Sequence, residues 1–184
     1  MRIISGKAKG TKLYTLEGLN TRPTLDRVKE SIFNIIQANI QDSLVLDLFA
    51  GSGAIGLEMV SRGAQKAILC DKSAEAIKII KKNIEKTHME ERIELYNMDF
   101  KECIQKVNNQ KFDLIYIDPP YNTDFIAQSL EMIVKKDIIK TDGIIILETD
   151  DEKRILKDIE EINVAIIDKR KYGRANIIFL NKKT

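Results

Sequence analysis

The residues best suited to chemistry are four consecutive positions after an apolar run, Asp118, Pro119, Pro120 and Tyr121. Two prolines fix the backbone and remove two N–H donors, so the segment offers acceptors: the Asp118 carboxylate and the Pro119 carbonyl. Such acceptors would orient an exocyclic base amine, a weak nucleophile, and stabilise positive charge as it reacts. The Tyr121 ring offers a face on which an extruded base can stack. The segment therefore predicts a site for a base amine, with a rigid strand-capping turn as the alternative.

A second motif lies in residues 45–58, where an apolar run stops at Asp47 and a glycine loop and then resumes with helical spacing. Gly51 and Gly53 allow a sharp turn and close approach of a ligand, and the helix N-terminus presents free N–H groups. With Gly56, these glycines also satisfy the dinucleotide pattern G-x-G-x-x-G, followed about twenty residues later by Asp71. Asp47 favours S-adenosylmethionine instead, because a carboxylate there would repel a pyrophosphate and attract a cationic ligand.

Predicted strands and helices alternate from residue 44 onward, and they must position these two motifs. The pattern predicts strands at 44–48, 66–70, 93–97, 112–117 and 143–148, and helices at about 54–61, 74–86, 100–107 and 124–134. This alternation is typical of an α/β fold, a doubly wound parallel sheet with helices on both faces. After Asp150 we expect a charged helix to about Ile162. Two strands, 164–171 and 176–180, then follow as an antiparallel hairpin.

Four successive strands end in an acidic residue: Asp47, Asp71, Asp99 and Asp118. Ligands bind beyond the carboxyl ends of strands in an open parallel sheet, so these carboxylates are expected to share one site. We assign Asp71 to ribose hydroxyls and Asp99 to the adenine amino group, although each could instead cap a helix. Neighbouring residues assigned to the same cofactor are Phe49, Ser52, Lys72 and Phe100.

Length and composition bound the remaining possibilities. A chain of 184 residues, 43% of them hydrophobic, can form one domain, with at most a small appendage. No apolar run has the length of a membrane span and the N-terminus lacks a secretory signal, so we expect a cytoplasmic protein. We also expect a monomer. Cys70 and Cys103 form no C-x-x-C pair, and the single histidine, His88, has no companion ligand, so no metal site is expected.

Charge is concentrated at the N-terminus. Residues 1–29 carry seven Lys or Arg and two acids, a net +5, whereas the whole chain carries +2. We therefore divide the chain into a basic arm or hairpin (1–23), with short strands at 1–4 and 12–14, and a Rossmann-like domain (24–184) that starts with a helix. A basic arm predicts a nucleic-acid partner, and a merely solvated surface is the alternative. The candidate RNA-binding residues are Arg2, Lys7, Lys9, Lys12 and Arg27.

The glycine loop followed by Asp-Pro-Pro-Tyr resembles the class I S-adenosylmethionine-dependent methyltransferases that act on exocyclic amines. Met-Arg-Ile-Ile-Ser-Gly-Lys at 1–7, Arg-Pro-Thr at 22–24, Asp-Arg-Val at 26–28, and segments 46–56 and 118–121 together resemble the RsmD family over nearly the whole chain. Members of that family methylate N2 of a guanine in small-subunit (16S) ribosomal RNA. Ser5 departs from the family pattern, which often has glycine there.

The resemblance implies a sheet of seven strands whose last strand is antiparallel. It also implies that S-adenosylmethionine is the cofactor, and that small-subunit ribosomal RNA or the assembled subunit is the partner. Three residues would close over the cofactor by the same resemblance: Arg22, Pro23 and Thr24.

Three other functions compete with this one. An N6-adenine DNA methyltransferase shares Asp-Pro-Pro-Tyr, but such enzymes usually carry a recognition insertion for which this chain has no room. A nicotinamide-dependent oxidoreductase would explain the glycines but not Asp47 or the prolines. A non-catalytic RNA-binding assembly protein would explain the basic arm alone.

Overall fold

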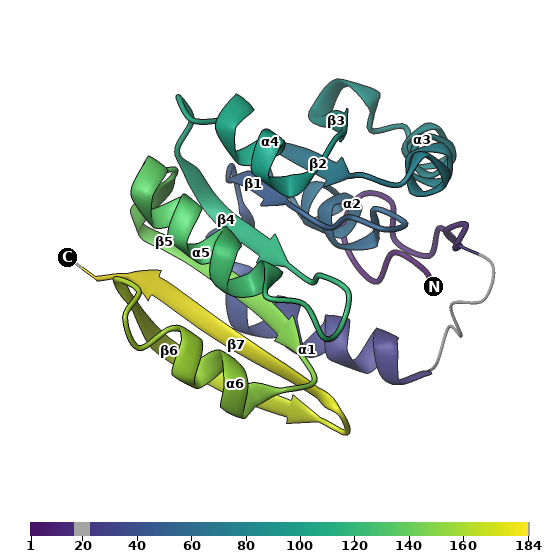
Figure 1. The fold of residues 1–184 in the computed structure, drawn as a ribbon. Helices are drawn as coiled ribbons and strands as arrows, with labels where there is room; N and C mark the ends of the chain where they lie inside the picture. The colour runs from purple at the N-terminus through teal and green to yellow at the C-terminus, as the bar shows by residue number, and fades with distance from the viewer. Residues whose placement is uncertain (17–22, 184) are drawn as a thin grey trace.

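The computed structural model describes residues 1–16 and 23–183 (Figure 1). The helices are α1 (Pro23–Ile40), α2 (Ala54–Ser61), α3 (Ala74–Thr87), α4 (Phe100–Lys106), α5 (Phe125–Lys136) and α6 (Glu152–Asp158), with a short 3₁₀ turn at Glu90–Arg92. The strands are β1 (Leu44–Asp47), β2 (Lys66–Asp71), β3 (Ile93–Asn97), β4 (Phe112–Ile117), β5 (Ile139–Thr149), β6 (Val164–Tyr172) and β7 (Ala175–Lys182).

One sheet of seven strands runs in the order β3-β2-β1-β4-β5-β7-β6. Strands β1 to β5 pair in parallel, and β7 is antiparallel to both β5 and β6. The predicted α/β class, strand number and reversed last strand are therefore confirmed. Because β1 lies between β2 and β4, the strand order reverses there, and such a reversal opens a crevice at the carboxyl ends of the two strands.

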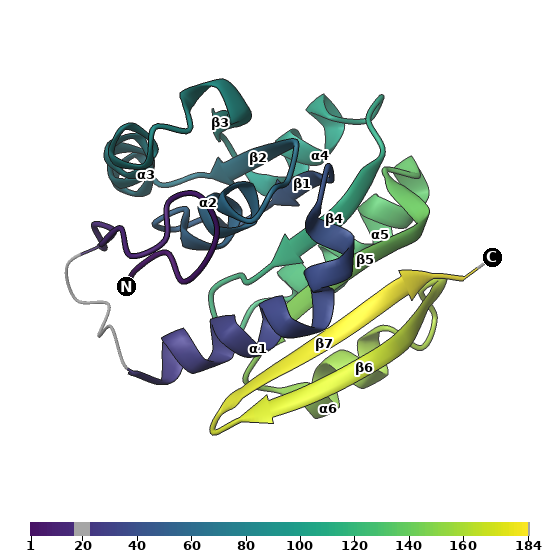
Figure 2. The same cartoon turned by 180° about the vertical axis from the view of Figure 1, so that it is seen from behind.

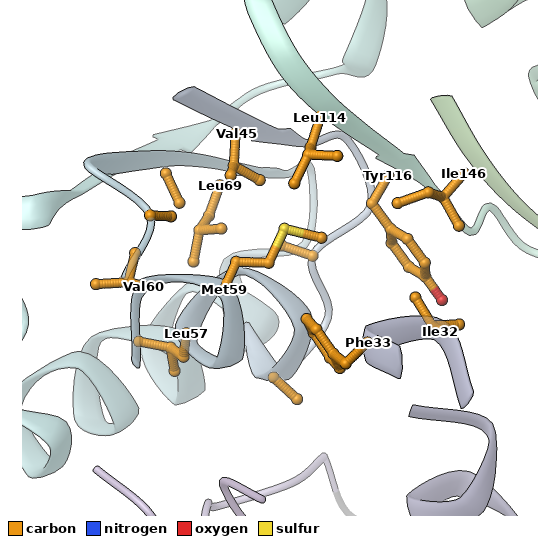
Figure 3. Close-up of a cluster of buried hydrophobic side chains, with 14 of the residues drawn as sticks. Ile32, Phe33, Val45, Leu57, Met59, Val60, Leu69, Leu114, Tyr116 and Ile146 are labelled. Carbon is orange, nitrogen blue, oxygen red and sulfur yellow. The ribbon is translucent and has the colours of Figure 1, made fainter. Parts of the chain in front are cut away.

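Helices cover both faces of the sheet. Figure 1 shows α4, α5 and α6 on one face, and Figure 2 shows α1 crossing the other. Central strands are buried on both sides, which explains their continuous apolar runs. Figure 3 shows one of the resulting cores, in which Phe33 of α1 and Met59 of α2 pack near Tyr116 of β4.

The N-terminal segment does not form the two short strands that we expected. Only one antiparallel bridge is present in its described part, between Arg2 and Lys12. Around this bridge the amides of Ile3 and Leu13 donate to the carbonyls of Thr11 and Met1 at 2.9 and 3.0 Å. The next amides, of Ile4 and Ser5, donate instead to the Glu58 carboxylate of α2 at 2.7 and 2.9 Å. The two segments therefore pair only around one bridge, and the loop beyond it is anchored on a helix.

The Glu58 carboxylate also pairs with one of the basic residues counted in the N-terminal segment. The Lys29 ammonium lies 3.4 Å from Glu58 and donates to the Arg2 carbonyl at 3.0 Å. Arg62 also donates to Glu58 at 2.8 Å. Lys29 is buried, and this burial lowers its pKa despite the partner charge. One of the seven basic residues counted in 1–29 is therefore a structural ion-pair partner rather than a surface charge.

Two further boundaries differ from the expected ones. Strand β5 begins at Ile139 rather than at residue 143. Ile139 pairs with Phe112, a register shift follows over an exposed polar stretch, and regular pairing starts at Ile144. Helix α6 ends at Asp158, earlier than the expected Ile162, since the following residues form turns that bury Ile159 and Ile162.

Candidate active site

A cavity of about 700 Å³ lies where β1, β4 and β5 end. Twelve of the residues that sequence analysis assigned to catalysis or to the cofactor line it: Asp47, Phe49, Gly51, Ser52, Asp71, Lys72, Asp99, Phe100, Asp118, Pro119, Pro120 and Tyr121. The two predicted motifs, more than sixty residues apart in sequence, thus share one cavity.

The other assigned cofactor residues lie elsewhere or cannot be placed. Gly53 is not a lining residue but precedes the first turn of α2. Arg22 lies outside the described residues. Pro23 and Thr24 are described only as the backbone that begins α1.

The glycine loop owes its shape to two left-handed residues and one carboxylate. Gly51 and Gly53 have φ values of 57° and 77°, which side chains with a Cβ rarely adopt. The Gly51 amide donates to Asp71 Oδ2 at 2.9 Å, fixing the loop to the end of β2. Gly56 has a different role, because a Cβ there would lie 2.1 Å from the Leu69 side chain. The third glycine of the motif therefore serves helix–sheet packing.

Asp47 is a buried acceptor with an unused oxygen. It is 1% exposed, and its Oδ1 accepts no hydrogen bond from the described residues. Burial, with the nearby negative charge of Asp71, raises the pKa of Asp47 to about 7. A cation in the cavity would offset both effects. The site is therefore electrostatically prepared for a positively charged ligand.

Helix capping, the alternative role for Asp71 and Asp99, is present only at Asp99, because Ser73 caps α3. Asp71 Oδ1 accepts from the Ser73 amide at 2.8 Å, while Asp99 caps α4 by accepting from the Lys101 amide at 2.9 Å. Both also line the cavity. Their proposed contacts with ribose and adenine stay predictions.

Three phenyl rings form an apolar wall of the cavity. The Phe49 and Phe100 ring centroids are 5.2 Å apart, and Phe125 lies 5.1 Å from Phe100. Lys72 Nζ lies 5.7 Å from the Phe125 ring. Phe125 was not assigned from sequence, because it begins a helix outside any recognised motif. Such a wall suits a flat heterocycle.

A second acid missed from sequence lies beside the Asp118 segment. Glu148 lines the cavity from the end of β5, and the Tyr116 hydroxyl donates to its Oε2 at 2.6 Å. Burial and the negative charges of Glu148 and Asp47 raise the pKa of Asp118 well above its usual value. Burial likewise raises the pKa of Glu148, although the Tyr116 bond opposes the shift. Without a ligand, these surroundings therefore favour the protonated forms of both acids.

Tyr121, the residue predicted to stack on a base, combines exposure to solvent with a place in the cavity lining. Tyr121 is 58% exposed at the cavity mouth, whereas Pro119 is buried. The stiff segment thus joins a buried acceptor to an exposed aromatic face.

All five candidate RNA-binding residues, Arg2, Lys7, Lys9, Lys12 and Arg27, are exposed. Next to them in sequence, Tyr14 is 49% exposed, and Lys86 Nζ of α3 lies 4.5 Å from its ring. Helix α3 therefore adds positive charge to this surface. Sequence analysis missed that addition, since it depends on how the N-terminal segment docks.

A family model described as "Conserved hypothetical protein 95" matches residues 1–181. The chain belongs to this family. The RsmD-family resemblance is confirmed by curated relatives. The Haemophilus influenzae protein named "Ribosomal RNA small subunit methyltransferase D" is 33% identical, covering 85% of this chain and 82% of that protein. A Bacillus subtilis protein, YlbH, named as a candidate rRNA methyltransferase, is 33% identical over the full length of both chains.

Among solved structures, the Escherichia coli protein yhhF, described as a candidate methyltransferase, superposes with a TM-score of 0.85 at 25% identity, covering 100% of this chain and 98% of that one. This likeness confirms the class I methyltransferase fold. No helix in residues 1–16 and 23–183 is long and apolar enough to cross a membrane. Within the same ranges, no three His, Cys, Asp or Glu side chains are grouped as metal ligands.

Proposed function

We propose that this protein transfers a methyl group from S-adenosylmethionine to the exocyclic N2 amine of a flipped guanine in small-subunit ribosomal RNA, either free or in the assembled subunit. The observation that carries the proposal is the shared cavity, which the Asp118 segment lines together with the glycine loop and Asp47. Family membership and the names of the relatives support the reaction and the RNA substrate. That the protein acts as a cytoplasmic monomer stays a prediction.

The residues present fit the cofactor. The unused Oδ1 of Asp47 is a buried acceptor suited to an ammonium or sulfonium, and the side-chain-free Gly51 leaves open space beside it. Phe49, Phe100 and Phe125 would hold the adenine ring, with Asp71 and Asp99 at the ribose and the adenine amine. A dinucleotide fits less well, because its phosphates would enter a cavity lined by several carboxylates.

The chain contributes orientation and charge to the reaction. When bound, S-adenosylmethionine supplies an electrophilic methyl group. The Asp118 carboxylate and the Pro119 carbonyl would accept hydrogen bonds from the two N–H groups of the guanine amine. These bonds would direct the lone pair of the amine toward the cofactor. As positive charge develops on the amine nitrogen during methyl transfer, the Asp118 carboxylate would stabilise it and accept its proton. Tyr121 would stack on the flipped base.

Nucleoside analysis tests this function. Ribosomal RNA from cells lacking the gene should lose one N2-methylguanosine per small subunit, and the purified protein with S-adenosylmethionine should restore it to those subunits. A change in N6-methyladenine of DNA instead would support the DNA methyltransferase. Binding to subunits without any methyl transfer would support an assembly protein, and either result would contradict the proposal.

A further inference from the structure

We infer that Glu148 determines the choice of base by accepting the N1–H of the guanine whose 2-amino group is held by Asp118 and Pro119. The inference rests on the proposed function and adds to it the residue that separates guanine from adenine.

The sheet register places the two acids side by side. In the parallel β4–β5 pair, Ile117 is opposite Leu147, so Asp118 and Glu148 are the next residues on neighbouring strands. Adjacent strands lie roughly 5 Å apart, and residues in register point to the same face. Tyr116, two residues before Asp118, shares that face. Two carboxylates and one phenol hydroxyl therefore meet at one wall of the cavity.

Tyr116 fixes which Glu148 oxygen is available. The tyrosine is 3% exposed, and its ring is packed in the apolar cluster beside Ile32 and Ile146 (Figure 3). Its hydroxyl donates to Glu148 Oε2 at 2.6 Å, whereas Glu148 Oε1 accepts no hydrogen bond from the described residues. Because the donor is held by packing, Glu148 is oriented before any substrate arrives. Its second oxygen is left as a preorganised acceptor in the cavity wall.

Two adjacent acceptors match the edge of guanine and not that of adenine. Guanine presents N1–H beside its 2-amino group, so one acid can accept from each. Adenine presents its 6-amino group beside an unprotonated N1, and that lone pair would face the Glu148 carboxylate. A site built to accept a proton discriminates strongly against an analogue that lacks it, because the buried acceptor is then left unpaired.

The test removes the proposed hydrogen bond between guanine N1–H and Glu148 in two ways, first by changing the base and then by changing the residue. The nucleotide methylated by the wild-type protein is located by mass spectrometry. Small subunits are then reconstituted with guanosine or 2-aminopurine riboside at that position. The 2-aminopurine base keeps the reacting amine but has an unprotonated N1. The wild-type protein should methylate guanosine on the order of a hundredfold faster than 2-aminopurine.

Glu148→Gln should remove most of that preference. The Tyr116 hydroxyl would hold the amide oxygen, so the amide NH₂ would face the base and oppose guanine N1–H while suiting the N1 of 2-aminopurine. We expect guanosine methylation to fall on the order of a hundredfold, the preference to shrink to within about tenfold, and S-adenosylmethionine affinity to persist. The matched control is Glu152→Gln, outside the cavity, which should change neither rate.

The outcomes separate the inference from the proposed function. If the wild-type protein transfers no methyl group to guanosine, both are overturned. If it methylates guanosine but Glu148→Gln keeps the wild-type preference, only the inference is overturned. Should Glu148→Gln fail to fold, Tyr116→Phe provides the same test, because freeing Oε2 should weaken the preference. An unchanged preference in that variant counts against Glu148.

Discussion

Asn83 of α3 donates a 2.8 Å hydrogen bond to the Ser52 carbonyl in the glycine loop. The same side chain brackets Tyr14, accepting from its amide at 2.7 Å and donating to its carbonyl at 2.9 Å. Asn83 is fully buried. One amide therefore ties the N-terminal segment, a central helix and the cofactor loop together.

Asn83→Ala should loosen both attachments. Each buried group left without a partner costs about 1–3 kcal/mol. We expect a melting temperature lower by roughly 5 °C or more. We also expect weaker S-adenosylmethionine binding, measured by calorimetry. Asn163→Ala is the control, since that exposed side chain bonds only the Lys183 carbonyl. Equal cofactor affinity in Asn83→Ala and wild type would show that the glycine loop does not need this tie.

Cofactor binding should weaken as pH falls. The pKa of Asp47 is about 7 in the free protein, and a cationic ligand binds its ionised form. Below pH 7 the carboxyl must lose a proton on binding, so the dissociation constant should rise, by up to about tenfold per pH unit. Calorimetry between pH 7.5 and 5.5 measures the slope. Asp118 and Glu148, whose pKa values are also raised, line the same cavity, so a variant of Asp47 is needed to assign the slope to that residue.

The Asp47→Asn variant measures how much Asp47 contributes to the pH dependence of cofactor binding. This variant should bind S-adenosylmethionine weakly and with a flatter pH profile. Its free form should be more stable than the wild type above pH 7, because a raised carboxyl pKa means that stability is lost as pH rises toward 7. An Asp47→Asn protein with the wild-type pH profile would place the titrating group elsewhere.

The basic N-terminal surface predicts a salt-dependent contact with RNA. Replacing Lys7, Lys9 and Lys12 with glutamine should weaken binding and flatten the slope of log affinity against log salt, by roughly 0.7–0.9 for each phosphate that is no longer neutralised. Filter binding across salt concentrations gives the slope. The matched control replaces Lys135, Lys136 and Lys157, exposed on α5 and α6. If both triple variants share the wild-type slope, the arm does not contact phosphates.

Much of the site could be predicted because its residues follow a local rule. Asp47, Asp71 and Asp118 each end an apolar strand or directly follow one, and parallel strands bring such ends to one edge. Glu148 obeys the same rule at the end of the fifth expected strand, so its place in the site could have been predicted in the same way.

Other parts depend on contacts that sequence does not reveal. Asn83 lies mid-helix among lysines, and Tyr116 lies within an apolar run, so neither position shows what the side chain touches. The N-terminal strands were wrong for a related reason. Their pairing stops after one bridge, because the amides of Ile4 and Ser5 donate to carboxylate oxygens of Glu58, more than fifty residues away.

The proposed mechanism depends most on Asp118, which is proposed to act on the amine and not on the cofactor. Asp118→Ala and Asp118→Asn are compared with Asp124→Asn, an exposed acid six residues later that does not line the cavity. The measurement is methyl transfer from labelled S-adenosylmethionine to small subunits lacking the modification, with cofactor affinity determined on the same preparations. We predict that both Asp118 variants keep cofactor affinity and lose on the order of a hundredfold or more in rate, while Asp124→Asn resembles the wild type. Near-normal turnover by both Asp118 variants would contradict the assignment and leave the Asp-Pro-Pro-Tyr segment as a rigid turn.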